Sequence, residues 1–528
     1  MDSNQDAQAA NLQVDPQMLS RKSKSGQSES LDERETDHDT SPNTQGTAAN
    51  IEQDDQEVNG MLSGAWEDDE YTHPRCDFKA LSAISDDQWR ETVRLLCHPA
   101  IGSEDVYLMG NTNGTFNGVV YVDCILNGTT HSYLVRVPAH GTLAHWTPED
   151  AYMLEREVEL IKNIRENTSV PVPEIMGHST GHNNVLRFPY IVRKKLPGRG
   201  AYNIWLEPGY DQSNNTLAYR TADVPSTATE KKRITFLRSL AKHMAQLDQL
   251  AFPCIGIPSF SSEGSFKESG PSYHWPTDGS DECATRLSCS STQEYLSNAH
   301  DDKFAITLPL VLNDATYELF GQRAIFRVLS NQTVFNSTDG DTFSIRHNDL
   351  DLQNILVDDE GNVTGIIDWD CAISAPRCIR AAAAPTFLRN DWFPYYANDI
   401  HAVPHMAWNY EYYRQIYAAA MVEAGNVEGA KYTIKSAMYA AAIAAVTEGG
   451  AATDFIDKLL REIPECRRTN ARDLTKGLGM GWKRAREMLE PHIAKIFEPT
   501  LPSVNLLRDL DAEMTMRSWW TEFDGALE

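Results

Sequence analysis

A short polar run followed by a two-strand hairpin is the feature of this sequence that most restricts its fold. The run contains His347, Asp349 and Asn354 in the spacing H-x-D-x-x-x-x-N. Residues 355–367 then read as two short apolar strands around a turn rich in Asp, Gly and Asn. Asp368 follows the second strand directly. We expect this hairpin to bring Asn354 and Asp368 to one end of two paired strands.

These residue types suit the transfer of a phosphoryl group. A carboxylate such as Asp349 can accept the proton of an attacking hydroxyl. The amide oxygen of Asn354 and the carboxylate of Asp368 suit Mg²⁺, which takes few protein oxygens and completes its shell with phosphates and water. His347 is expected to brace the loop. Taken singly, each of these residues is also a common turn residue, so the evidence lies in the set.

Upstream of this run the sequence predicts an antiparallel sheet with flanking helices. Asn127-Gly128 is a strong two-residue hairpin signal between two runs rich in Val and Tyr. Thr147 followed by Pro148 and two acidic residues is typical of a helix start. The expected elements are a helix over 86–97, strands over 106–109, 118–126, 129–137 and 188–192, and a helix that begins at 148.

The C-terminal part reads as mainly helical. Its Ser-, Gly- and Pro-rich stretch over 259–292 is interpreted as a long inserted loop. Helices are expected over 234–250, 317–329, 410–424 and 431–447.

Residues 1–75 differ in composition from the rest. They hold 17 acidic and 5 basic residues, so much of the net charge of −28 lies there. Such a segment buries too little apolar surface to offset its ordering entropy, and we expect a disordered, dispensable acidic tail. The predicted organisation is therefore a tail over 1–75, a sheet-containing lobe over 76–197 and a helical lobe over 198–528.

The overall composition excludes several classes of function. A net charge of −28 argues against a nucleic-acid binder and against docking on anionic lipid. No apolar run approaches the roughly 20 residues that span a bilayer, and the N-terminus has no secretory signal, which favours a cytoplasmic protein. Nine cysteines without a CxxC pair indicate neither a disulfide framework nor a zinc site.

The catalytic segment resembles the aminoglycoside phosphotransferase and choline-kinase-like branch of the protein-kinase-like superfamily, in its fungal form. That branch has His-Gly-Asp with an Asn five residues after the Asp, and then Ile-Asp-Trp or Ile-Asp-Phe. Here Asn348 stands in place of the Gly, and Ile367-Asp368-Trp369 matches the second motif. The resemblance runs over about residues 77–500 and is strongest at 343–370. It implies a bilobal α+β kinase-like fold, with an antiparallel β N-lobe and a mainly helical C-lobe.

The resemblance also implies a nucleotide site in the N-lobe. Gly110, Gly114 and Gly118 match the loop that covers the phosphates, and their other interpretation is plain turn glycines. Arg136 matches the cation of the third strand, which is Lys in most kinases. Glu157 matches the carboxylate of the following helix that pairs with this cation. An ordinary surface ion pair is the alternative for these two residues.

The activity implied is transfer of the γ-phosphate of ATP, with Mg²⁺, to a hydroxyl of a small-molecule acceptor. Asp349 would be the base, His347 its brace, and Asn354 and Asp368 the metal ligands. No Ala-Pro-Glu segment follows Asp368, which disfavours a protein kinase with an activation loop. The alternative is a pseudokinase, a nucleotide-binding or scaffold module without turnover, which the replacement of Lys by Arg136 supports.

Overall fold

The computed structural model describes a large part of the chain. The described residues are 66, 72–206, 222–275, 283–305, 311–336, 341–393, 396, 404–447, 451–503 and 505–514. Most of the predicted tail over 1–75 lies outside them.

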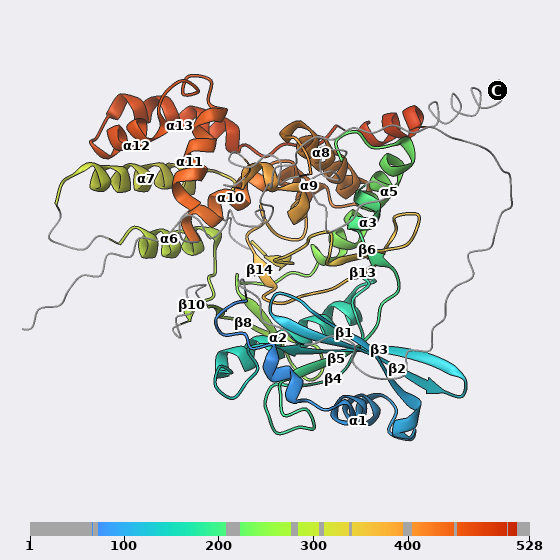
Figure 1. Cartoon of the computed structure of the whole chain (residues 1–528). Helices are drawn as coiled ribbons and strands as arrows, with labels where there is room; N and C mark the ends of the chain where they lie inside the picture. The colour runs from blue at the N-terminus through green and yellow to red at the C-terminus, as the bar shows by residue number, and fades with distance from the viewer. Residues whose placement is uncertain are drawn as a thin grey trace, which may run out of the picture. The chain divides into compact units, whose positions relative to one another are not determined.

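A five-stranded antiparallel sheet in the order β1-β2-β3-β5-β4 forms the first part of the fold (Figure 1). Its hairpin at Asn127-Gly128 is confirmed, and both residues have the positive φ angles, 51° and 75°, that such a turn requires. The elements are η2 (Lys79–Ala83), α1 (Asp86–Cys97), η3 (Ser103–Asp105), β1 (Val106–Asn113), β2 (Asn117–Leu126), β3 (Thr129–Pro138), α2 (Pro148–Asn167), β4 (Ile175–Ser179) and β5 (Tyr190–Lys194).

The two faces of this sheet pack against different helices. Val135 and Val192 are paired across β3 and β5 and belong to a core with Trp89 and Val93 of α1. The opposite face carries Ile191, which packs against Leu154 and Val158 of α2. Because side chains alternate along a strand, each residue of β3 and β5 is assigned to one face by its position.

The folded part of the chain begins before the predicted boundary at residue 76. Trp66 is 6% exposed and belongs to the core of the sheet. Arg75 is 4% exposed and forms an ion pair with Asp150 of α2. The acidic composition of residues 1–75 as a whole does not reveal these two buried side chains.

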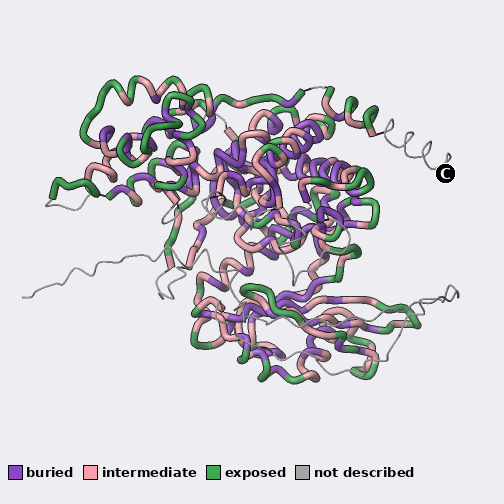
Figure 2. Tube along the Cα trace, turned by 45° about the horizontal axis from the view of Figure 1, so that its top comes forward, coloured by how far each residue is buried: buried purple, intermediate pink, exposed green. Residues whose placement is uncertain are grey.

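The remaining described chain is mainly helical, and most of its buried residues belong to two large clusters. Figure 2 shows the buried stretches, in purple, along these helices. The elements are β6 (Arg199–Gly200), α3 (Tyr202–Trp205), α5 (Thr227–Leu247), β7 (Ile257–Phe260), β8 (Phe266–Gly270), β9 (Ser272–His274), β10 (Ala284–Arg286), α6 (Thr292–Lys303), α7 (Asp314–Ser330), β11 (Ser344–Arg346), β12 (Ile355–Val357), β13 (Val363–Ile366), β14 (Ile373–Ala375), η5 (Thr386–Leu388), η6 (Asn390–Trp392), α8 (Ala407–Glu423), α9 (Val427–Thr433), α10 (Ser436–Thr447), α11 (Ala451–Glu462), α12 (Ala471–Gly479) and α13 (Lys483–Phe497).

The prediction of a long loop over 259–292 was wrong. This region contains the antiparallel pairs β7–β8 and β9–β10 and the start of α6. The backbone N–H of Phe260 donates to Glu159 of α2 at 3.0 Å, and Tyr273 packs edge-on against Tyr152 of the same helix. These strands are ordered by their contacts with α2, which their Ser- and Gly-rich composition does not reveal.

The predicted α+β class is confirmed, with an antiparallel sheet followed by a mainly helical part. Within the described residues, no helix combines the length and the apolar character needed to cross a membrane.

Candidate functional site

The hairpin β12–β13 brings the two sequence motifs together. Ile355 pairs with Ile366, and the carbonyl oxygen of Asn354 accepts the backbone N–H of Ile367 at 2.9 Å. Asn354 and Asp368 therefore lie at the same end of the hairpin, as its pattern predicted.

Asp349 and Asn354 are in direct contact within the loop that precedes β12. The amide nitrogen of Asn354 donates to a carboxylate oxygen of Asp349 and to its backbone carbonyl, both at 2.9 Å. Asn354 is buried, whereas Asp349 is exposed. The amide oxygen of Asn354 is then the atom of this side chain that would face a cation, and the Asp349 carboxylate is open to a second reactant.

His347 connects this loop to the segment that carries Asp368. Its Nε2 donates to the carbonyl oxygen of Ile367 at 2.9 Å, and its ring packs edge-on against Trp369. His347 is 3% exposed, and its Nδ1 is buried without a hydrogen-bond partner. Burial lowers the pKa of His347 to about 4. A neutral imidazole that donates to a carbonyl is a brace and not an acid or base at neutral pH.

This brace predicts a specific loss of stability in acid. The pKa of His347 falls from an ordinary value of 6.5 to about 4 on folding, so the unfolded chain binds a proton first as pH falls. The contribution of neutral His347 to the free energy of unfolding is complete above pH 6.5 and is lost progressively as the pH falls towards 4. Between pH 7 and 5 this residue alone should lower the free energy of unfolding by about 2 kcal/mol.

The measurement is urea unfolding of the wild type and of His347→Gln at pH 7 and pH 5. His243 and His274 also have pKa values lowered to about 4 by burial, so the wild type should lose more than this one share. The variant should be less stable at pH 7 but have the shallower pH dependence. Equal slopes for the two proteins would contradict the buried, neutral state of His347.

Arg136 is the centre of a buried charge cluster. It is 4% exposed and forms an ion pair with Glu157 of α2, which is equally buried. Its Nη1 lies 3.3 Å from Asp368 Oδ1 and 3.7 Å from Asp370 Oδ2. Burial raises the pKa of Glu157, and the guanidinium of Arg136 opposes that rise. The pair that the resemblance implied is thus formed, inside the protein and not on its surface.

Asp368 has a backbone conformation that few residues adopt. Its φ is 66°, in the left-handed region, where Asp and Asn are the side chains best tolerated apart from Gly. Partial removal from water raises the pKa of Asp368, an effect that Arg136 opposes. Strained backbone of this kind is concentrated at functional sites, because surrounding contacts must hold it in place.

The oxygen donors of the site fit Mg²⁺. Asn354 and Asp368 offer one amide and one carboxylate oxygen at one end of the hairpin, and Asp368 is about two-fifths exposed, which leaves room for water or phosphate. In the described part of the chain no group of three or more His, Cys, Asp and Glu is placed to hold a metal ion. Beside phosphates, Mg²⁺ usually has only one or two protein ligands, and water and phosphate oxygens fill its other coordination positions.

The three glycines occupy different environments along the β1–β2 hairpin. Gly110 has a φ of 136° at an irregularity in β1, and a side chain there would meet nothing within 4 Å. Gly114 lies in the turn and donates its N–H to the carbonyl of Asn117. A Cβ at Gly118 would lie within 3.0 Å of Leu81 and Trp66. Gly118 is therefore required by close packing in the sheet core.

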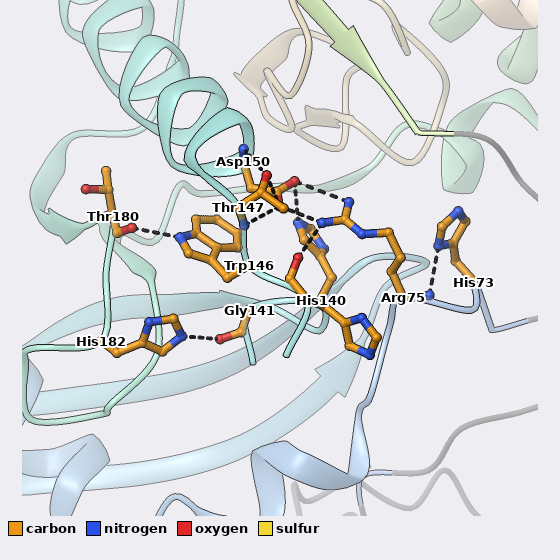
Figure 3. A network of polar contacts seen from close by, with 10 residues as sticks. His73, Arg75, His140, Gly141, Trp146, Thr147, Asp150, Thr180 and His182 are labelled. Carbon is orange, nitrogen blue, oxygen red and sulfur yellow. Dashed lines mark hydrogen bonds and ion pairs between the residues drawn. The ribbon is translucent and has the colours of Figure 1, made fainter. Parts of the chain in front are cut away.

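The start of α2, the helix that carries Glu157, is fixed by a second buried ion pair (Figure 3). Arg75 Nη2 donates to Asp150 Oδ2 at 2.6 Å, and Asp150 closes a capping box with Thr147. The guanidinium of Arg75 stacks 3.6 Å from the ring centre of Trp275. Asp150 and Glu157 are seven residues apart and share a helix face, so this anchor and the Arg136 ion pair orient the same helix.

Sequence reasoning missed Arg193, on β5. The charged groups that act on this buried guanidinium are Arg136, Glu157 and Asp368, and the hydroxyl of Tyr121 also lies near it. The available signal is a charged residue that directly follows the apolar run Tyr-Ile-Val of this strand.

Comparison with known proteins gives one family. Residues 315–415, which contain the catalytic loop, the hairpin and Asp368, match the model of the "Phosphotransferase enzyme family". No curated protein matches this chain.

The solved structures to which this chain is similar have low sequence identity to it. A macrolide 2′-phosphotransferase type I is 15% identical and covers 74% of this chain and 95% of its own, with a TM-score of 0.34. The choline kinase of Cryptosporidium parvum is 11% identical, covers 78% and 98%, and has a TM-score of 0.35. The Plasmodium vivax ethanolamine kinase is 10% identical, covers 72% and 88%, and has a TM-score of 0.35. These values are too low to assign an activity.

The family match falls on the segment from which the resemblance was first inferred. The motif H-x-D-x-x-x-x-N, the hairpin and the Ile-Asp-Trp sequence all lie inside it. Over residues 315–415 the resemblance is thereby confirmed, since this segment matches the phosphotransferase enzyme family.

Proposed function

We propose that the protein transfers the γ-phosphate of ATP to a hydroxyl of a small-molecule acceptor. The observation that carries this proposal is the meeting of Asp349, Asn354 and Asp368 at one end of the β12–β13 hairpin, with Arg136 in contact with Asp368. A base, two oxygen ligands for Mg²⁺ and a phosphate-binding cation are the parts that this reaction needs.

Each side chain has a separate task. The exposed carboxylate of Asp349 accepts the proton of the acceptor hydroxyl and orients its oxygen. Asn354 and Asp368 would hold Mg²⁺, which neutralises charge on the β- and γ-phosphates. Arg136, oriented by Glu157, stabilises negative charge on the nucleotide. His347 keeps the base and the metal ligands in register.

A small-molecule acceptor is supported by the segment after Asp368. Chain residues 373–375 already form β14, which pairs with β11 directly before the catalytic loop. The Ser374 hydroxyl is buried and donates to the carbonyls of Cys254 and Gly256. Within the described residues 369–393, this early strand leaves no long loop directly after the metal motif on which a peptide substrate would dock.

The pseudokinase alternative is not favoured. It rested on Arg136 in place of Lys, yet this guanidinium pairs with Glu157 and reaches Asp368, as the usual cation would.

The test is a screen of hydroxyl-bearing small molecules with γ-labelled ATP and the full chain, with and without Mg²⁺. We expect Mg²⁺-dependent transfer of label to at least one acceptor, and slow ATP hydrolysis without one. Asp349→Asn is measured in parallel, because label transfer that persists in this variant would come from a contaminating kinase. Absence of both transfer and hydrolysis, in a protein shown to be folded, would contradict the proposal.

A further inference from the structure

The strand register places two arginines on the same face of the sheet. Across β3 and β5, Leu134 pairs with Arg193 and Arg136 pairs with Ile191. Directly paired residues share a face, and so do residues two apart along a strand. Arg136 and Arg193 therefore share the face that carries the charge cluster, opposite the face whose Val192 packs in the core with α1.

Arg193 is buried without a partner of its own. It is 7% exposed, and its Nε has no hydrogen-bond partner. No carboxylate of the described residues forms an ion pair with it, and the nearby carboxylates Glu157, Asp368 and Asp370 pair with Arg136. Burial lowers the pKa of Arg193 and the charge of Arg136 adds to the effect, whereas the carboxylates of Glu157 and Asp368 oppose it from beyond ion-pair distance.

Such an arrangement is unfavourable for the protein alone. Burying a charged group without a partner destabilises the folded state, and two cations on one sheet face repel each other. A buried arginine of this kind is stabilised when an anion binds beside it. A guanidinium presents several N–H donors in one plane, which match the oxygens of a phosphate.

We propose that Arg193 is a second phosphate-binding residue, which contacts the nucleotide phosphates together with Arg136. This inference rests on the proposed function, because that function brings a polyphosphate to the same face of the sheet. It adds a residue that neither the sequence motifs nor the family segment over 315–415 includes.

The test uses Arg193→Met, which keeps an unbranched side chain of similar length and removes the charge. Calorimetry should show the Kd of ATP and of tripolyphosphate raised by tenfold or more, as expected for the loss of a hydrogen bond to a charged group. The Kd of adenosine should not change, because adenosine has no phosphate. Lys194→Met is the matched control: it removes an exposed cation from the next position of β5 and should leave all three affinities unchanged.

The melting temperature without ligand distinguishes a phosphate-binding role of Arg193 from a role in stabilising the fold. Arg193→Met should melt at the same temperature as the wild type or higher, since an unpaired buried charge is removed. A melting temperature several degrees lower would show that Arg193 supports the fold, and would overturn the inference.

The outcomes separate this inference from the proposed function. Equal ATP affinity in the wild type and Arg193→Met overturns the inference and leaves the phosphotransferase proposal intact. Weaker affinity for adenosine as well as ATP also overturns it, because Arg193 would then serve the base. Arg193-dependent ATP binding in a protein that transfers no phosphate supports the inference while the proposed activity fails. A wild type that binds neither ATP nor tripolyphosphate contradicts both.

Discussion

Asp349→Asn should leave the affinity for Mg·ATP unchanged and lower kcat by about 10²–10⁴-fold. Asn keeps the size of the side chain, and its oxygen still accepts the amide hydrogen of Asn354, so the loop should keep its shape. What is lost is the ability to accept the proton of the acceptor hydroxyl. A positioned base of this kind lowers the barrier by roughly 3–5 kcal/mol.

Steady-state kinetics on the identified acceptor and calorimetry with Mg·ATP measure the two quantities separately. Asp359→Asn is the control, because Asp359 is an exposed carboxylate at the opposite end of the same hairpin and forms an ion pair with the exposed Arg199. Near wild-type kcat in Asp349→Asn would remove this residue from the mechanism. A loss of Mg·ATP affinity would assign it to the metal instead.

The elements that the sequence predicted well are those fixed by neighbouring residues. Thr147 caps the helix that begins at Pro148, as the pattern indicated, and α1 begins and ends at its predicted residues. The β12–β13 hairpin likewise follows from two apolar runs and a turn between them. Each of these signals acts over a few residues, where local hydrogen bonding and side-chain periodicity decide the structure.

Features that depend on distant partners were missed. Trp66 and Arg75 belong to the fold because of Gly118 and Asp150, and neither contact is visible in a composition dominated by acidic residues. The strands β7 and β8 are ordered against α2 by contacts such as the one between Phe260 and Glu159. Long-range packing overrides a weak local preference for loop.

The residues of the candidate site likewise divide into those that neighbouring sequence predicts and those that depend on distant contacts. Asp349, Asn354 and Asp368 lie within 20 residues of one another, and their spacing alone predicted that they meet. Arg136 and Glu157 were found only through the resemblance. Arg193 has no motif around it, and its importance depends on burial and register, which only the structure supplies.

Asp368→Asn should remove the Mg²⁺-dependent part of ATP affinity and lower kcat/KM by about 10²–10³-fold, the effect of losing several kcal/mol of metal-mediated charge stabilisation. Asn is a better test than Ala, because Asp368 has a φ of 66° and Asn tolerates that conformation whereas Ala does not. Metal-free ATP should bind equally well or more tightly, since a carboxylate that repels the phosphates is gone while Arg136 remains.

Asp370→Asn is the matched control for this prediction. The side chain of Asp370 is as exposed as that of Asp368, and its carboxylate lies 3.7 Å from the same Arg136 guanidinium. Asp370 is two residues further along the chain, past the end of the hairpin at which Asn354 lies. Removing either carboxylate changes the charge around Arg136 by the same amount, so a general electrostatic effect would appear in both variants. Loss of Mg²⁺ dependence in Asp368→Asn alone would identify Asp368 as a ligand. Equal Mg·ATP affinity in the wild type and Asp368→Asn would exclude it.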